Sequence, residues 1–227
     1  MKAVVLEMYG PPDVLHLADV AEPVPARGEI KIAVAAAAIN PADVKWRGGL
    51  LRQYSELVFP QVLGYDVAGT VCGLGDDVAG LSIGDRVVGM VDHRLKGGYA
   101  EYAIVEPQAC VKLPDTLDMA LAAAIPTPGL TGKQLIEETI CPQAGQRVLI
   151  TGACGAVGRF AVYAALQLDV RVVAGVRAGQ RQLASDLGAN EVVVIGEQYH
   201  GVPFDHVADT VGGPDVAALC GHVAPAG

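Results

Sequence analysis

Residues 146–158 read QRVLITGACGAVG, and they decide the fold of the second half of the chain. The apolar run 148–150 predicts a buried strand, and the apolar segment 160–168 predicts a helix directly after the glycines. Glycines at 152, 155 and 158 allow a tight turn, close approach of a pyrophosphate to the backbone, and close packing of helix on strand. The helix N-terminus adds amide donors and a dipole that favours an anion. The stretch therefore predicts a dinucleotide site, and an ordinary tight turn is the alternative.

This loop departs from the usual G-x-G-x-x-G sequence at one position, because Ala153 stands where the first glycine is expected and Gly152 precedes it. Its position inside a strand–helix–strand unit still favours binding over a plain turn. The candidate cofactor-binding residues of the loop are Gly152, Gly155, Ala156, Val157 and Gly158.

The residues after the second predicted strand, 170–176, indicate which dinucleotide binds. An NAD site holds an acidic residue there, about 20 residues after the loop, for the ribose 2′-hydroxyl. The sequence has no acid at this place, and Arg177 and Arg181 can face a 2′-phosphate instead. We therefore predict NADPH rather than NADH. The alternative is that both arginines are solvated residues at the start of a helix.

The arrangement of apolar runs predicts an α/β chain of two domains. Short runs bounded by turn residues make residues 1–120 rich in strands, and residues 121–227 alternate strands with helices, which implies a parallel sheet. The predicted parallel strands are 147–151, 170–176, 191–195 and 204–211. A complete dinucleotide-binding sheet of this type has about six strands, so the chain is expected to be truncated at its C-terminus.

Composition excludes several classes of protein. With 52% hydrophobic residues and a net charge of -9, the 227-residue chain is neither disordered nor built to bind nucleic acid. Its apolar runs fall short of the roughly 20 residues of a membrane span, and its start shows no secretory signal. Five cysteines without a C-x-x-C pair favour reduced thiols, so we expect a cytoplasmic protein. The histidines share no spacing typical of a metal site, and no G-x-S-x-G hydrolase motif is present.

A short helix is predicted from the sequence NPADVKWRGG at residues 40–49. Asn40 suits the N-cap, Pro41 the first helical position, and Gly48 a left-handed stop. A surface turn of helix between strands is a complete explanation. The same helix also brings Asn40 and Lys45 beyond a strand end, where polar side chains can face a cleft.

Several motifs together resemble one known family: Asn40-Pro41-Ala42-Asp43 with Arg47 and Gly49, 64–71 (GYDVAGTV), 97–102 (GGYAEY), 126–131 (PTPGLT) and the loop 152–158. The chain resembles the zinc-free quinone oxidoreductases, the zeta-crystallin branch of the medium-chain dehydrogenase/reductase superfamily. The resemblance covers the whole chain. It implies a GroES-like β domain followed by a Rossmann domain, NADPH as cofactor, and reduction of quinones or other electron-poor conjugated carbonyls by direct hydride transfer. Zinc-dependent relatives have a Gly-His-Glu where this chain has Gly64-Tyr65-Asp66, and a cysteine where it has Asn40.

The resemblance also assigns expected roles to single residues. Asn40 matches the family's asparagine near the nicotinamide, and Thr131 matches a threonine at the cofactor. The family often has tyrosine where this chain has Lys45 and Ile195, and a lysine near Gln180, so substrate preference does not transfer.

The expected catalytic residues are Asn40 and Lys45, which can stabilise negative charge on the acceptor oxygen, although a lysine on a short exposed helix is often only solvated. We expect a homodimer with a small-molecule substrate. Two other functions remain open: an enoyl-thioester reductase of the same superfamily, and a non-catalytic NADPH-binding protein.

Overall fold

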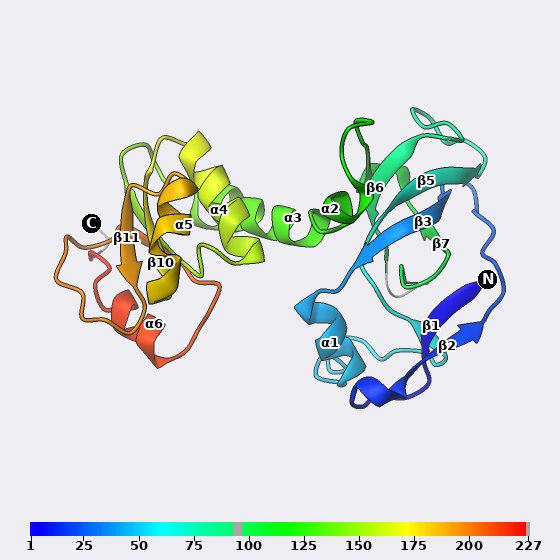
Figure 1. Ribbon diagram of the computed structural model, residues 1–227, viewed down its shortest axis with the longest axis horizontal. Coiled ribbons are helices and arrows are strands. Elements are labelled where there is room, and N and C mark those ends of the chain that lie inside the picture. Colours follow the sequence, from blue (N-terminus) through cyan, green and yellow to red (C-terminus); the bar gives the residue numbers. More distant parts are fainter. Residues whose placement is uncertain (93–96, 226–227) are drawn as a thin grey trace. The chain divides into compact units, whose positions relative to one another are not determined.

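The computed structural model describes residues 1–92 and 97–225, which form two compact units, Met1–Thr127 and Pro128–Gly227 (Figure 1). The division after Thr127 lies on the C-terminal side of the expected boundary after residue 120. The reason is helix α2 (Met119–Ala123), whose buried Ala122 and Ala123 pack with Ala68 and Val88 of the first unit. No helix in the described part of the chain is long and apolar enough to cross a membrane.

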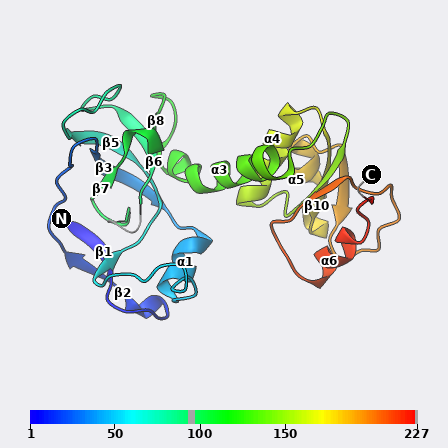
Figure 2. The same cartoon turned by 180° about the vertical axis from the view of Figure 1, so that it is seen from behind.

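The first unit is built from two antiparallel sheets, as Figure 2 shows from behind. The larger sheet has the strand order β7 (Tyr102–Val105), β3 (Ile30–Ala38), β5 (Asp66–Leu74), β6 (Arg86–Met90) and β8 (Cys110–Lys112). The smaller sheet has the order β2 (Leu15–Asp19), β1 (Lys2–Leu6) and β4 (Gln61–Val62). Alternating apolar residues of β3, β5 and β6 form the core of the larger sheet, among them Ile30, Ile32, Val67, Val71 and Val87.

Helix α1 (Pro41–Arg47) follows β3 where the sequence predicts a helix. Its end differs in detail from the prediction: Gly48 has a right-handed φ of -75°, and Gly49 takes the left-handed position with φ +73°. A Cβ on Gly49 would also lie 3.1 Å from the Tyr9 ring, so the second glycine of the pair is the one that the turn requires. Two short 3₁₀ segments, η1 (Pro12–Val14) and η2 (Pro107–Ala109), complete this unit.

The second unit has a parallel sheet in the order β11 (Glu191–Val194), β10 (Arg171–Val176), β9 (Arg147–Thr151) and β12 (His206–Ala208). Helices α4 (Ala156–Gln167) and α5 (Arg181–Asp186) bury their small residues on one face of this sheet. Helix α6 (Pro214–Cys220) packs on the other face through Leu219. Helix α3 (Pro126–Gln134) begins two residues before the division between the units, and the π-helix η3 (Leu135–Ile140) and the 3₁₀ turn η4 (Ala178–Gln180) lie in the second unit.

This sheet confirms the predicted parallel α/β fold, with one strand shorter than expected. β12 spans three residues instead of 204–211, because the chain turns at Asp209, whose carboxylate accepts the backbone N–H groups of Val211 and Gly212. The polar groups that sequence analysis assigns to a strand are therefore used in a turn at its carboxyl end.

Candidate functional site

The glycine loop between β9 and α4 has the geometry that its sequence predicts. Gly152 has φ +61°, and a Cβ there would lie 2.7 Å from Thr210 Oγ1 and from a Val211 methyl group. A Cβ on Gly158 would lie 2.1 Å from the Gly152 carbonyl oxygen, so helix and loop pack too closely for any side chain. Gly155 occupies the N-cap of α4, and its N–H donates to the Gly152 carbonyl at 2.7 Å.

The N-terminus of α4 is open to an anion. The first intrahelical bond runs from Arg159 N–H to the Gly155 carbonyl, which leaves the N–H groups of Ala156, Val157 and Gly158 without acceptors in the helix. Gly155 and Ala156 are exposed, and no side chain caps the helix. Three amides without an acceptor in the helix, a positive dipole end and a loop without bulky side chains fit the pyrophosphate of a dinucleotide.

A hydrogen-bonded link between two strand ends lies beside this loop, and sequence analysis missed it. Thr151, the last residue of β9, is fully buried and donates its hydroxyl to Asp209 at 2.6 Å. Thr210 donates its N–H to the Thr151 hydroxyl and its own hydroxyl to the Thr151 carbonyl. Although partial burial raises the pKa of Asp209, hydrogen bonds from Thr151, Gly212 and Val211 outweigh it and lower the pKa. The link joins β9 to β12, the neighbours at which the strand order reverses and dinucleotides bind in such sheets.

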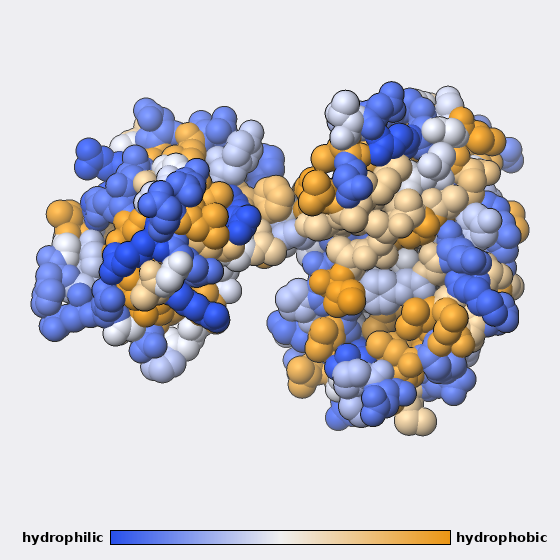
Figure 3. Space-filling model, viewed as in Figure 1, coloured by the Kyte–Doolittle hydropathy of each residue, from blue (hydrophilic) through white to orange (hydrophobic). Residues whose placement is uncertain are grey.

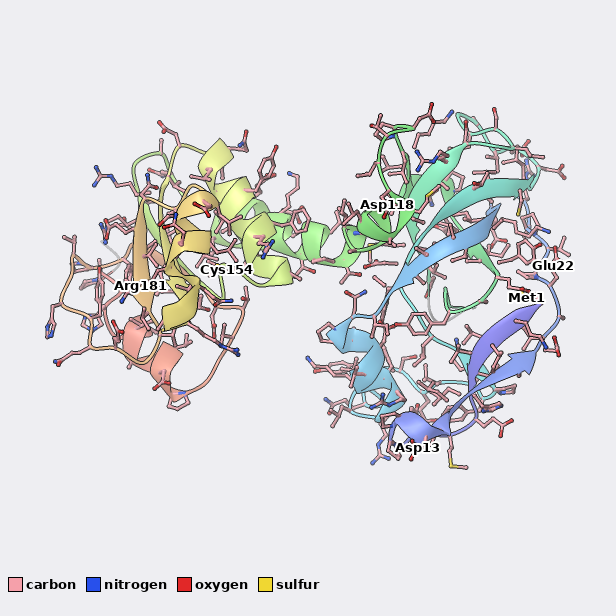
Figure 4. All side chains as sticks on the ribbon, viewed as in Figure 1. Met1, Asp13, Glu22, Asp118, Cys154 and Arg181 are labelled. Carbon is pink, nitrogen blue, oxygen red and sulfur yellow. The ribbon has the colours of Figure 1, made fainter. Side chains whose placement is uncertain are left out.

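Arg177 and Arg181 both follow the carboxyl end of β10, as predicted, but their surroundings differ. Arg177 is exposed, and no carboxylate in the described residues lies within ion-pair distance of it. Arg181 begins α5 and pairs with Glu197 at 2.9 Å. Figure 4 labels Arg181, and it also labels Cys154 of the glycine loop. The Cys154 backbone carbonyl accepts a hydrogen bond from Arg159 Nε. Glu197 is an acid that sequence analysis missed, since it follows the third strand rather than the second.

In the first unit, Asn40 lies in a buried polar cluster with Asp66 and Thr127. The Asn40 side-chain amide donates to Asp66 Oδ2 at 3.0 Å, while its backbone N–H donates to Asp43 at 2.7 Å. Asp66 is fully buried and also accepts the Thr127 hydroxyl at 2.7 Å and the Thr127 backbone N–H. In the sequence, Asp66 is distinguished only as an acidic residue at the first position of a mostly apolar strand.

Asp43 fixes the start of α1 to two other segments. Its carboxylate accepts the N–H of Asn40 and, at 3.1 Å, the N–H of Gly64, and it interacts with the Tyr99 hydroxyl. Burial raises the pKa of Asp43 in spite of these hydrogen bonds. Burial and the nearby Asp43 carboxylate likewise raise the pKa of Tyr99. The helix that carries Lys45 therefore has a fixed orientation within the first unit.

The remaining residues named in the sequence analysis differ in exposure. Lys45 is exposed on α1, and no carboxylate of the described residues lies within ion-pair distance of it. Thr131 is exposed on α3, and Ile195 is half-buried after β11. Tyr65, at the position of a zinc ligand in zinc-dependent relatives, accepts a hydrogen bond from Trp46 Nε1 at 2.6 Å.

Among the described residues there is no cluster of three His, Cys, Asp or Glu side chains that could hold a metal ion. His93, one of the histidines considered above, lies outside the described residues.

Comparison with known proteins agrees with this architecture. Residues 26–115 match the alcohol dehydrogenase GroES-like domain. A quinone oxidoreductase from Coxiella burnetii superposes with a TM-score of 0.86 at 31% identity, over 99% of this chain and 73% of that one. The chain belongs to the zeta-crystallin-like quinone oxidoreductase branch of the medium-chain dehydrogenase/reductase superfamily.

Other members of the superfamily agree. An alcohol dehydrogenase superfamily protein from Novosphingobium aromaticivorans is 33% identical with a TM-score of 0.86, over 98% of this chain and 69% of that one. The quinone oxidoreductases of Lama guanicoe and human are 37% and 35% identical over 195 residues, which are 85% of this chain. The chain spans 58% of the length of these two curated relatives.

Proposed function

We propose that this chain carries out NADPH-dependent reduction of quinones or related electron-poor conjugated carbonyls, without a metal. The open amide donors of the glycine loop, with Arg177 and Arg181 at the end of β10, carry the proposal. It is also supported by the name quinone oxidoreductase on several relatives, and by a mycobacterial homologue solved with NADPH, 30% identical with a TM-score of 0.84 over 99% of this chain.

The cofactor is held by backbone groups and arginines. The N–H groups of Ala156, Val157 and Gly158 bind the pyrophosphate, and Arg177 and Arg181 bind the 2′-phosphate, with Thr131 as a further cofactor contact. A bound nicotinamide supplies the hydride, so the protein's own groups need only bind, orient and stabilise charge.

Asn40 and Lys45 are proposed to stabilise the charge that develops on the acceptor oxygen. One N–H of the Asn40 amide is held by Asp66, which leaves the second N–H of the same nitrogen as a donor in a fixed direction. The Lys45 ammonium supplies a full positive charge that no carboxylate of the described residues neutralises. Preorganised donors of this kind take over the role that a metal has in zinc-dependent relatives.

The surface near Lys45 favours an apolar acceptor. Large hydrophobic side chains of the segment around α1 are exposed, namely Ile39, Val44, Leu50, Tyr54 and Val58. Figure 3 shows hydrophobic surface, in orange, on the first unit. Exposed apolar groups beside a cation suit a flat, weakly polar molecule with a carbonyl oxygen, which a quinone or an enone is.

A second candidate function is reduction of an enoyl thioester. The trans-enoyl reductase himH of Aspergillus japonicus is 33% identical over 86% of this chain. As an enoyl-thioester reductase, this chain would use the same cofactor residues with a different acceptor. As a non-catalytic NADPH-binding protein, it would bind the cofactor through these residues and reduce no acceptor.

We further propose that the protein works as a homodimer in a reducing compartment such as the cytoplasm. The five cysteines are all free, which supports a reducing compartment.

The test is steady-state NADPH oxidation with an ortho-quinone, a simple enone and an enoyl-CoA, beside NADPH titration followed by protein fluorescence. We expect turnover with the quinone or the enone, unchanged after treatment with a chelator. Turnover with enoyl-CoA alone would favour the second candidate. Tight NADPH binding without turnover of any acceptor would favour a binding protein. Loss of activity with the chelator, restored by zinc, would contradict the metal-free mechanism.

A further inference from the structure

The contact between Arg181 and Glu197 joins the carboxyl ends of two neighbouring strands. Arg181 starts α5 after β10, and Glu197 follows β11, so 16 residues separate them in sequence. The Arg181 Nη2 and Glu197 Oε2 atoms are 2.9 Å apart, and the two side chains are 51% and 59% exposed. Both line a pocket of about 190 Å³, together with Val192, Tyr199 and Leu219. The pair is therefore accessible to a bound molecule.

The two arginines after β10 are not equivalent, because Glu197 pairs with only one of them. Arg177 has no carboxylate within ion-pair distance in the described residues, so its charge is available to a phosphate. Arg181 already contacts a carboxylate, and a phosphate that binds it must displace Glu197 or lie beside it. Either arrangement weakens phosphate binding, since like charges a few ångströms apart repel each other.

We propose that Glu197 sets the dinucleotide preference of this site by neutralising Arg181. This inference rests on the proposed NADPH site. A 2′-phosphate carries nearly two negative charges, so each nearby cation strengthens its binding. A ribose 2′-hydroxyl carries no charge and does not depend on these cations in the same way. Glu197 therefore lowers the affinity for NADPH and leaves the affinity for NADH unchanged. The alternative is that the Glu197 carboxylate accepts hydrogen bonds from the ribose hydroxyl groups, which would raise the affinity for NADH.

The experiment compares Glu197→Gln with the parent chain and with Glu138→Gln. Glutamine keeps the length of the Glu197 side chain and removes its charge. Because Glu197 is exposed, we expect the variant to fold like the parent, and thermal melting checks this. Glu138 is an exposed glutamate of the same unit, in η3, and its variant has the same change in net charge. Dissociation constants for NADPH and NADH are measured by protein fluorescence at low and at physiological salt.

We expect Glu197→Gln to bind NADPH about 3- to 10-fold more tightly than the parent, with the larger gain at low salt, and to bind NADH as the parent does. Glu138→Gln should leave both constants unchanged. In an Arg181→Met background, Glu197→Gln should give a clearly smaller gain for NADPH, because the cation that it releases is absent and only the repulsion between Glu197 and the phosphate is relieved.

Three results would overturn the role of Glu197: an unchanged NADPH constant in Glu197→Gln, weaker NADH binding in that variant, or an equal gain in the Arg181→Met background. The proposed NADPH site is judged separately, on the parent chain. If the parent binds NADPH and Glu197→Gln changes nothing, only the inference fails. If the parent binds neither dinucleotide, the proposed function fails, and the role of Glu197 fails with it.

Discussion

The side-chain nitrogen of Asn40 lies 3.0 Å from Oδ2 of Asp66, and both residues are buried. Asn40 therefore precedes a short helix and also binds a carboxylate of strand β5 through its side chain. Its amide is oriented by a carboxylate at the start of a different strand, 26 residues away in sequence. This contact changes which substitutions of Asn40 are informative.

We predict that Asn40→Asp destabilises the protein, although aspartate is an equally good residue before a helix. The change places a second carboxylate against buried Asp66, and we expect a cost of about 2 kcal/mol or more at pH 7. Melting temperatures at pH 7 and pH 5 measure it, with Asn40→Ala as the control that lacks the added charge. The Asp variant should lose more stability at pH 7 than at pH 5. An equal loss at both pH values would show that charge repulsion is not the cause.

We predict that Lys45→Met lowers kcat with a quinone about 10-fold and leaves the melting temperature unchanged, because Lys45 is exposed and methionine keeps much of its alkyl chain. Lys112→Met, which removes a lysine paired with Asp85 in the same unit, is the control for a general charge effect. Parent-like kcat in Lys45→Met would remove this side chain from the mechanism.

We predict that NADPH binds about tenfold more tightly than NADH, since one charge-assisted contact to a phosphate contributes ~1.5–3 kcal/mol. Arg177→Ala should lose most of this preference, because Arg177 is the arginine that no described carboxylate neutralises. Titration of both dinucleotides measures the ratio. Equal affinities in the parent, or a full preference in the variant, would contradict the assignment.

We predict that Asp209 contributes to the acid sensitivity of the second unit. Its pKa in the folded state lies below its ordinary value of 3.8, so the stabilisation that it provides is complete above that value and is lost as the pH falls through the lowered pKa. Urea unfolding between pH 2.5 and 6 should therefore show a weaker pH dependence for Asp209→Asn than for the parent. Asp215→Asn, on α6, is the control and should retain the dependence of the parent.

The elements that depend on neighbouring residues in sequence could be predicted. The glycine loop, the parallel strands and α1 follow from apolar periodicity and from residues that need particular backbone angles. The contacts of Asp66, Asp209 and Glu197 could not be predicted in this way, because each partner lies on a different strand or loop. Gly64-Tyr65-Asp66 stands out in the sequence as part of a motif, but only the fold shows that Asp66 accepts hydrogen bonds from Asn40 and Thr127.

The hydrogen bonds between Asp66 and Thr127 also decide where the polypeptide can be divided. Thr127 is the last residue of the first unit, and both its hydroxyl and its backbone N–H serve a carboxylate with no access to solvent. A fragment that stops at residue 120 lacks these donors and most of α2, so of the donors described above only the Asn40 amide would remain for the Asp66 carboxylate. A fragment that ends after Thr127 keeps every donor. Anyone who separates the two units for crystallisation or spectroscopy should therefore cut on the C-terminal side of this threonine.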